Sequence, residues 1–236
     1  MGALAGVDAV ILAGGKGKRL RSVVADRPKV LAEVAGKPFI CYLLDYLGTS
    51  GIRRAVLCTG FMADLVSDTL GDSYNGIELK YSREDEPMDT AGAVRLALPK
   101  IQSDPALVLN GDSFYRADMH GFHAFYTRND AKGTLMLAEV EDVQRYGSVR
   151  IDESGRIVAF EEKLANTGRG LVSAGIYLLS RDLLESIPDG GPASFEREVF
   201  PSWVNHGLFG FPNKGMFLDI GTPESFLSAQ AFFGAQ

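Results

Sequence analysis

A short segment near the amino end combines glycines with basic side chains, as loops that bind phosphate groups do. It reads Ala13-Gly14-Gly15-Lys16-Gly17-Lys18-Arg19-Leu20 and directly follows the apolar run Val7 to Leu12. Glycines leave backbone N–H groups open to an anion because no Cβ covers them, and the dipole of a helix that follows such a loop favours negative charge. Arg21 and Lys29 extend the basic cluster. We therefore expect this loop to bind a polyphosphate.

Two common nucleotide-binding loops fit these residues less well. A dinucleotide-binding loop requires a third glycine where Leu20 stands, and an acidic residue after the second strand, where Thr59-Gly60 stand. This disfavours an NAD-dependent oxidoreductase. A P-loop requires Gly-Lys-Ser/Thr after four intervening residues, and neither Gly17-Lys18-Arg19 nor Gly36-Lys37-Pro38 supplies it. A glycine turn with a solvated basic rim is the structural alternative that stays open for the loop alone.

The elements that must position this loop alternate between strand and helix patterns in the first half of the chain. Apolar runs predict strands at 7–12, 55–58, 78–81 and 106–109, and helical spacing predicts helices at 40–47, 63–70 and 91–98. The second half is richer in strands, at 134–140, 148–151, 156–160 and 171–179. We expect two helices after them, one carrying Phe195, Val199 and Trp203 and one that begins after an N-cap at Thr222. Repeated β–α units predict a three-layer α/β/α fold with a mixed, mostly parallel sheet.

Composition limits the classes of protein that this chain can belong to. Its 236 residues fit one domain, 1–236, and its net charge of −6 argues against a nucleic-acid partner, which a basic face would hold. Cys41 and Cys58 stand alone in apolar stretches, which is typical of core residues in a reducing cytoplasm. We find no leader peptide and no run near the roughly 18 apolar residues of a membrane span. We expect a cytoplasmic protein without a membrane partner.

The glycine loop, together with Pro28-Lys29, closely resembles the signature of the sugar-1-phosphate nucleotidyltransferases. Counterparts of five further segments occur in that family in the same order: Asn110-Gly111-Asp112, Tyr146-Gly147, Glu162-Lys163, Ala174-Gly175 and Asp219-Ile220-Gly221-Thr222. The segments Arg145-Tyr146-Gly147-Ser148-Val149 and Ser173-Ala174-Gly175-Ile176-Tyr177 are most similar to those of the D-glycero-α-D-manno-heptose 1-phosphate guanylyltransferases. The resemblance covers most of the chain.

The resemblance implies a nucleotidyltransferase fold and a reaction. GTP and heptose 1-phosphate would give GDP-heptose and pyrophosphate for capsule, S-layer or lipopolysaccharide assembly. Mannose 1-phosphate is the nearest alternative substrate. The protein could form a homodimer. Since the sugar phosphate is already ionised, attack on the α-phosphorus needs positioning and charge neutralisation but no general base. A non-catalytic nucleotide-sugar sensor is a different interpretation of the fold, and the retained Arg19, Lys29, Asp112 and Asp219 argue against it.

Roles for individual residues follow from the same resemblance. We expect the nucleotide over about 1–112 and the sugar over about 113–236. Arg19, Lys29 and Asp112 are the expected catalytic residues, and Asp112 and Asp219 the expected ligands of Mg²⁺, since two carboxylates and phosphate oxygens suit this hard cation. The expected nucleotide-binding residues are Leu12, Ala13, Gly14, Gly15, Lys16, Gly17, Lys18, Arg19, Thr90, Ala91, Gly92 and Gly111, and the expected sugar-binding residues are Asn110, Tyr146, Gly147, Glu162, Lys163, Ala174 and Gly175.

The sequence departs from the family pattern at a few of these positions. Many relatives carry Thr at the position of Lys18, Pro at that of Val30 and Pro at that of Leu164. Asp89 stands where a glycine is frequent, in the segment that faces the base and the sugar. These differences bear on specificity more than on the chemistry of transfer.

Overall fold

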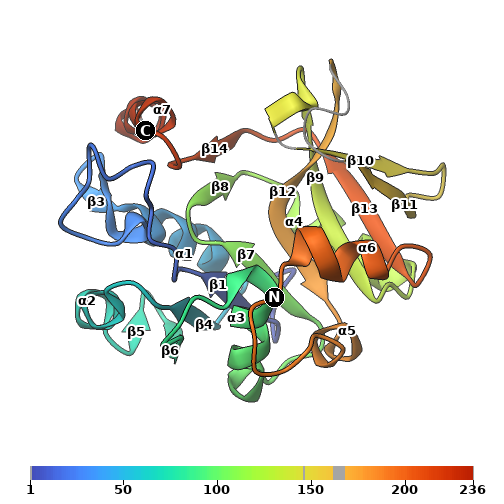
Figure 1. The fold of residues 1–236 in the computed structure, drawn as a ribbon, viewed down its shortest axis with the longest axis horizontal. Helices are drawn as coiled ribbons and strands as arrows, with labels where there is room; N and C mark the ends of the chain where they lie inside the picture. Colours follow the sequence, from blue (N-terminus) through green and yellow to red (C-terminus); the bar gives the residue numbers. More distant parts are fainter. Residues whose placement is uncertain (1, 146, 162–167, 236) are drawn as a thin grey trace.

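A computed structural model describes residues 2–145, 147–161 and 168–235. Three residues expected in the sugar site, Tyr146, Glu162 and Lys163, lie outside these ranges. The fold is a three-layer α/β/α arrangement around one large mixed sheet, as the sequence predicts (Figure 1).

The central sheet has eight strands in the order β13-β9-β12-β7-β1-β4-β6-β5. From one edge to the other these are Leu208–Asn213, Gly133–Val140, Gly170–Leu179, Ala106–Asn110, Asp8–Leu12, Arg54–Thr59, Ile77–Arg83 and Ser73–Tyr74. Strands β7, β1, β4 and β6 run parallel, whereas β12 is antiparallel to both of its neighbours. The carboxyl ends of four parallel strands therefore meet at one edge, where ligands of open α/β sheets bind.

Helices cover both faces of this sheet. One face carries α1 (Phe39–Thr49), α2 (Ala63–Leu70) and α4 (Met119–Arg128), and the other carries α3 (Asp89–Ala97) and α5 (Arg181–Glu185). Helix α7 (Pro223–Gly234) closes the chain, and short 3₁₀ turns occur at Lys29–Leu31, Leu98–Lys100 and Val143–Arg145. No helix of the described residues is long and apolar enough to cross a membrane.

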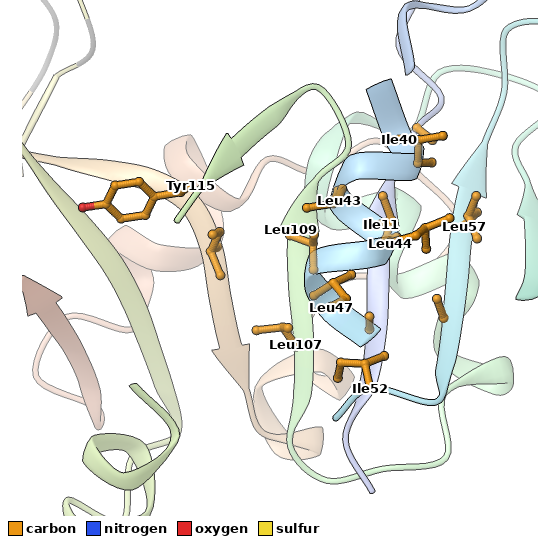
Figure 2. Close-up of a cluster of buried hydrophobic side chains, with 14 of the residues drawn as sticks. Ile11, Ile40, Leu43, Leu44, Leu47, Ile52, Leu57, Leu107, Leu109 and Tyr115 are labelled. Carbon is orange, nitrogen blue, oxygen red and sulfur yellow. The ribbon is translucent and has the colours of Figure 1, made fainter. Parts of the chain in front are cut away.

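Alternate residues of the buried strands supply the two main cores. In β1, Ile11 points to the face where Leu44 and Leu47 of α1 pack (Figure 2), while Val10 joins the cluster around α3 on the opposite face. Cys41 and Cys58 are buried free thiols in these clusters, as expected from the sequence. Burial on both faces explains why these strands read as continuous apolar runs.

Small two-stranded sheets lie beside the main one. Strand β2 (Glu33–Val34) pairs with β3 (Lys37–Pro38), β10 (Ser148–Ile151) with β11 (Ile157–Glu161), and β8 (Ser113–Tyr115) with β14 (Phe217–Asp219). The last pair is antiparallel and joins the segment after β7 to a segment about a hundred residues later (Figure 1). This pairing sets Asp219 opposite Ser113 and so brings it close to Asp112, the residue just before β8, as the predicted metal site requires.

The helix predicted to carry Phe195, Val199 and Trp203 is not one regular α-helix. Residues Phe195 and Val199 are buried, as their spacing indicated, but they belong to a π-helix, Phe195–Val199, and the helix α6 that follows covers only Phe200–Ser202. The N–H groups of Val199 and Phe200 bond five residues back, to the Ser194 and Phe195 carbonyls, and the next residue, Pro201, has no N–H with which to return to i to i+4 bonding. Trp203 caps α6 and is half-buried.

Candidate active site

A pocket of about 910 Å³ opens at the carboxyl ends of β1, β4, β6 and β7. Most of the predicted nucleotide-binding residues line it, together with all three predicted catalytic residues. They are Leu12, Ala13, Gly14, Gly15, Lys16, Gly17, Lys18, Arg19, Lys29, Thr90 and Asp112, joined by Asn110 from the predicted sugar set. The pocket is therefore the place where the sequence-predicted residues meet.

The glycine loop enters the pocket directly from β1. The N–H of Ala13 donates to the carbonyl of Cys58 in β4 at 2.8 Å, so the loop leaves the sheet in a fixed direction. Gly17 has a φ of +56°, and a Cβ there would lie 3.2 Å from the Lys29 Cβ. Glycine thus lets the loop turn tightly against Lys29.

No helix follows the glycine loop, contrary to the expectation of a helix dipole at this point. Residues 18–23 instead form turns, held by bonds such as Leu20 N–H to the Gly17 carbonyl at 3.0 Å. Leu20 is buried beside Phe226 of α7 and anchors the loop, which explains an apolar residue where a dinucleotide-binding loop needs glycine. The loop therefore offers an anion its N–H groups and basic side chains, without a helix dipole.

Charged side chains of both signs converge at one side of the pocket, where Arg19, Lys29 and Asp112 line the wall and Asp219 lies behind Gly221 without lining it. Lys29 Nζ lies 2.5 Å from Asp112 Oδ2, and the lysine side chain is only 12% exposed. A Cβ on Gly221 would lie 2.8 Å from Asp219 Oδ1 and 3.5 Å from both Arg19 Nη2 and Lys29 Nζ. Gly221 therefore marks the point around which two cations and two carboxylates gather.

Backbone contacts hold the two carboxylates in place. The Ile220 N–H donates to the Asp112 carbonyl at 3.0 Å, next to the β8–β14 pairing. Asp219 Oδ1 accepts from Gly221 N–H at 2.7 Å and from Ser225 Oγ at 2.9 Å. Ser225 belongs to the capping box that Thr222 starts at α7, so the predicted N-cap also orients Asp219.

The donor atoms fit a hard cation such as Mg²⁺. In the described part of the chain, one oxygen of Asp112 and one of Asp219 accept no hydrogen bond, which leaves each free to bind a cation. The described residues contain no group of three or more histidine, cysteine or acidic side chains that could hold a metal without other ligands. An ion bound here therefore needs further oxygen ligands, which phosphate groups would supply.

The opposite wall carries an acidic residue that the sequence did not single out. Glu84 follows β6 and lies against Gly14 and Gly60, where a Cβ would come within 2.5 Å and 2.6 Å of its Oε1. Its Oε2 accepts the Met88 N–H at 3.2 Å. Burial raises the pKa of the Glu84 carboxyl above its ordinary value. A partly desolvated acceptor therefore faces the pocket from the end of β6.

Asp89 adopts a backbone conformation that glycine would favour. Its φ is +56°, in the left-handed region, where Asp is tolerated better than most residues. Its carboxylate accepts the Thr90 N–H at 2.8 Å and pairs with the Arg197 guanidinium. These contacts explain how an aspartate can stand where many relatives carry glycine.

Several predicted residues are not on the pocket wall. Ala91 and Gly92 are buried, and both donate their N–H groups to the Ala193 carbonyl, so the structure places them behind the wall. Gly111 is also buried, and a Cβ there would lie 2.7 Å from the Leu12 carbonyl oxygen. These residues shape the wall by close packing.

The predicted sugar side is built around Asn110. Gly175 has a φ of +71°, and a Cβ there would lie 2.4 Å from Asn110 Nδ2. Ala174 is buried in the core, and Gly147 turns with a φ of +80°. Of this set, only Asn110 lines the pocket among the described residues.

Cys58 also lines the pocket but is no nucleophile. Burial, with the nearby Glu84, raises the pKa of its thiol to about 12. Because the thiolate is the reactive form, this side chain is inert near neutral pH. The site therefore offers positioning and charge, without a covalent intermediate on cysteine.

Comparisons with known proteins agree on one family. The model of the nucleotidyl transferase family matches residues 8–236. A mannose-1-phosphate guanylyltransferase of Mycobacterium tuberculosis is 36% identical over 229 residues, which are 95% of this chain and 64% of that protein. A D-glycero-alpha-D-manno-heptose 1-phosphate guanylyltransferase of Aneurinibacillus thermoaerophilus is 33% identical over 225 residues, which are 95% of this chain and 97% of that protein.

A solved structure supports the same grouping. HddC from Yersinia pseudotuberculosis is 35% identical, with a TM-score of 0.84, and the match covers 96% of this chain and 99% of that one. The same protein in complex with GMP-PN matches with a TM-score of 0.84 and 34% identity. The present chain thus spans nearly the whole length of two such relatives and about two thirds of the Mycobacterium protein.

Proposed function

The chain belongs to the nucleotidyl transferase family, and from that premise we propose that it transfers a guanylyl group from GTP to D-glycero-α-D-manno-heptose 1-phosphate. The products are GDP-heptose and pyrophosphate, which would serve surface polysaccharide synthesis. Two relatives that match nearly the whole of this chain are named as sugar-1-phosphate guanylyltransferases, which supports this class of reaction. The heptose is the narrower part of the proposal.

The convergence of Arg19, Lys29, Asp112 and Asp219 around Gly221 is the observation that carries this proposal. Nucleotidyl transfer moves negative charge from the attacking phosphate to the leaving pyrophosphate, so its catalysts neutralise charge and hold the groups in line. Arg19 neutralises the leaving pyrophosphate, and Lys29 neutralises the α-phosphate. The attacking phosphate oxygen is already ionised, so no residue has to remove a proton.

Mg²⁺ would be held by Asp112 and Asp219 together with phosphate oxygens. When bound, it supplies charge neutralisation to the nucleotide and to the incoming sugar phosphate. Lys29 holds the Asp112 carboxylate in place through its 2.5 Å contact, and the capping box at α7 orients Asp219.

Glu84 supports guanine as the base. With the phosphates at the basic loop, the base lies toward β4 and β6, and Glu84 closes that end of the pocket. Guanine carries two adjacent donors, N1–H and the exocyclic amine, and a carboxylate accepts both. Adenine presents an acceptor at N1, so the same carboxylate disfavours it.

Mannose 1-phosphate is the second candidate acceptor. The Mycobacterium relative, which is 36% identical, carries that sugar in its name, and the heptose in question has the manno configuration. Three of the seven residues expected to bind the sugar, Tyr146, Glu162 and Lys163, lie outside the described residues.

A substrate matrix tests the proposal. The protein is incubated with Mg²⁺, each of the four nucleoside triphosphates and several sugar 1-phosphates, and products are identified by mass spectrometry. We expect GDP-heptose as the fastest product and GDP-mannose second. Faster product formation from another nucleotide would refute the base assignment, and the absence of any nucleotide sugar would refute the enzyme.

A further inference from the structure

A chain of hydrogen bonds runs behind the pocket from Thr90 on one wall to Gly175, which packs against Asn110 on another wall. Thr90 lines the pocket at the first turn of α3, and Asn110 lines it at the end of β7. Thr90 belongs to the expected nucleotide side and Asn110 to the expected sugar side. The residues between them come from β12 and the π-helix, far from both in sequence.

On the nucleotide side, the Thr90 hydroxyl is held by the π-helix. Thr90 Oγ1 donates to Glu196 Oε2 at 3.1 Å and accepts the Phe195 N–H at 2.9 Å. Ser194 Oγ donates to the same carboxylate oxygen at 3.2 Å. The hydroxyl is therefore fixed by a charged acceptor and a backbone donor, which leaves it one orientation.

On the sugar side, the same carboxylate is reached by a buried tyrosine. Tyr177 OH donates to Glu196 Oε1 at 3.0 Å and accepts from Ser173 Oγ at 3.3 Å. Ser173 Oγ accepts the Gly175 N–H at 3.2 Å, and Gly175 lies directly against the Asn110 side chain. Each hydroxyl donates toward Glu196, so the chain has a single, consistent direction.

The surroundings of Tyr177 keep this chain intact. The side chain is 1% exposed and packs against the rings of Phe195 and Phe200. Burial and the Glu196 charge raise the pKa of the Tyr177 phenol well above its ordinary value, so it stays protonated and donates. Glu196 lies in the π-helix, an irregular turn that occurs often at functional sites.

We propose that Glu196 is a positioning residue that couples the two substrate walls, through Thr90 on the nucleotide side and through Tyr177, Ser173 and Gly175 on the sugar side. A substrate that contacts one wall stabilises the hydrogen-bonded arrangement around Glu196, so the second substrate has less of the other wall left to order. Binding of nucleotide and of sugar phosphate then favour each other. The inference rests on the proposed function, because it assumes that both substrates occupy this pocket.

A double-mutant cycle between Thr90→Val and Tyr177→Phe tests the coupling. Their hydroxyls do not bond each other and meet only at Glu196. Initial rates of pyrophosphate release are measured over a grid of GTP and sugar 1-phosphate concentrations. We expect Thr90→Val to raise KM for the sugar 1-phosphate, and Tyr177→Phe to raise KM for GTP, each about 3- to 10-fold, the equivalent of one hydrogen bond. Thr90→Ser, which keeps the hydroxyl, should keep the wild-type KM for the sugar 1-phosphate.

The combined variant separates coupling from independent effects. The variants are compared by the product of the two KM values. Coupled residues give a double variant no worse than about the larger single effect on this product, whereas independent ones multiply to roughly 10- to 100-fold. Tyr46→Phe is the matched control, because among the described residues its hydroxyl bonds only the backbone of Ala117 and lies outside the chain of hydrogen bonds. Its KM values should equal those of the wild-type protein. Ser173→Ala, which removes the next link, should reproduce the KM change of Tyr177→Phe.

The outcomes distinguish this inference from the proposed function. Wild-type protein that releases no pyrophosphate with any substrate pair refutes the proposed function and this inference with it. Active wild-type protein with multiplicative variants refutes the coupling alone. A drop in kcat without a change in either KM, accompanied by a lower Tm, also refutes it, because a purely structural role lowers the active fraction and not the affinities.

Discussion

Replacing Glu84 by glutamine should separate base recognition from phosphate transfer. The side chain is held by packing against Gly14 and Gly60 and by the Met88 N–H at 3.2 Å, so glutamine can occupy the same place. Its amide oxygen keeps the bond to Met88, which turns the amide N–H₂ toward the pocket. A donor then faces the two donors of guanine where an acceptor stood.

The loss follows from the kind of bond that is removed. Hydrogen bonds to charged groups contribute about 1.5 to 3 kcal/mol, which corresponds to a roughly 10- to 150-fold lower kcat/KM for GTP. Adenine lacks the N1–H donor, so kcat/KM for ATP should change much less. In the wild-type protein, kcat/KM for inosine triphosphate, which lacks the exocyclic amine, should lie between the values for GTP and ATP.

Glu84→Gln should lower the activity with GTP but raise the stability of the folded protein at neutral pH. Because burial raises the pKa of Glu84 in the folded state, the folded protein binds this proton more tightly than the unfolded chain. The stability from that proton is present at low pH and lost as the pH rises through the folded-state pKa. Glu84→Gln removes the charged, partly buried form, so its Tm relative to wild type should increase as the pH is raised from 4 toward 8.

The assay is steady-state pyrophosphate release with GTP, inosine triphosphate and ATP, alongside thermal melting at several pH values. Glu78→Gln is the control, because Glu78 lies on β6, the strand that Glu84 follows, but is exposed and paired with Arg54 and Lys80. An unchanged ratio of GTP to ATP efficiency in Glu84→Gln would refute the role of Glu84 in reading the base.

Further substitutions test the loop, the sugar wall and the helix cap. Arg19→Ala should lower kcat/KM for GTP about 100-fold through lost charge neutralisation, and unchanged kinetics of pyrophosphate release would exclude that role. Gly175→Ala places a Cβ 2.4 Å from Asn110 Nδ2, whereas Gly190→Ala, with a similar φ of +80°, meets open space. We expect Gly175→Ala to be less stable than Gly190→Ala by about 1 to 3 kcal/mol, and equal Tm values would contradict the steric explanation. Thr222→Ala should cost about 1 kcal/mol by removing the capping box, and Thr222→Ser should restore it in a thermal melt.

The helices and strands that could be predicted from the sequence are those with a clear apolar pattern, because they bury either both faces or one continuous face. The polar helix expected at 63–70 is α2 (Ala63–Leu70), and the strand expected at 106–109 is β7 (Ala106–Asn110). Strand β8 (Ser113–Tyr115) is too short to show a period. Strand β13 (Leu208–Asn213) contains Gly210 and Pro212, residues that weaken a strand pattern and are tolerated at its edge position.

The candidate site was predictable where local sequence carries it and not where tertiary contact creates it. The glycine loop and Asp112 could be found because both follow apolar strands of a parallel sheet. Glu84 could not, since its place beside Gly14 and Gly60 depends on three segments distant in sequence. The acidic run Glu84-Asp85-Glu86, two residues after the strand expected at 78–81, was the available signal. The links that Glu196 makes to Thr90 and Tyr177 likewise exist only in the folded chain.

The central claim is that Asp112 and Asp219 together hold the Mg²⁺ that the reaction needs. The most direct test is the dependence of pyrophosphate release on Mg²⁺ in wild-type protein, Asp112→Asn and Asp219→Asn. Asp64→Asn is the control, since this exposed residue of α2 lies away from the pocket. We expect both site variants to keep the wild-type Tm within a few degrees while losing at least about 100-fold in kcat/KM and requiring more Mg²⁺. Wild-type activity and Mg²⁺ dependence in either variant would contradict the joint role of the two carboxylates.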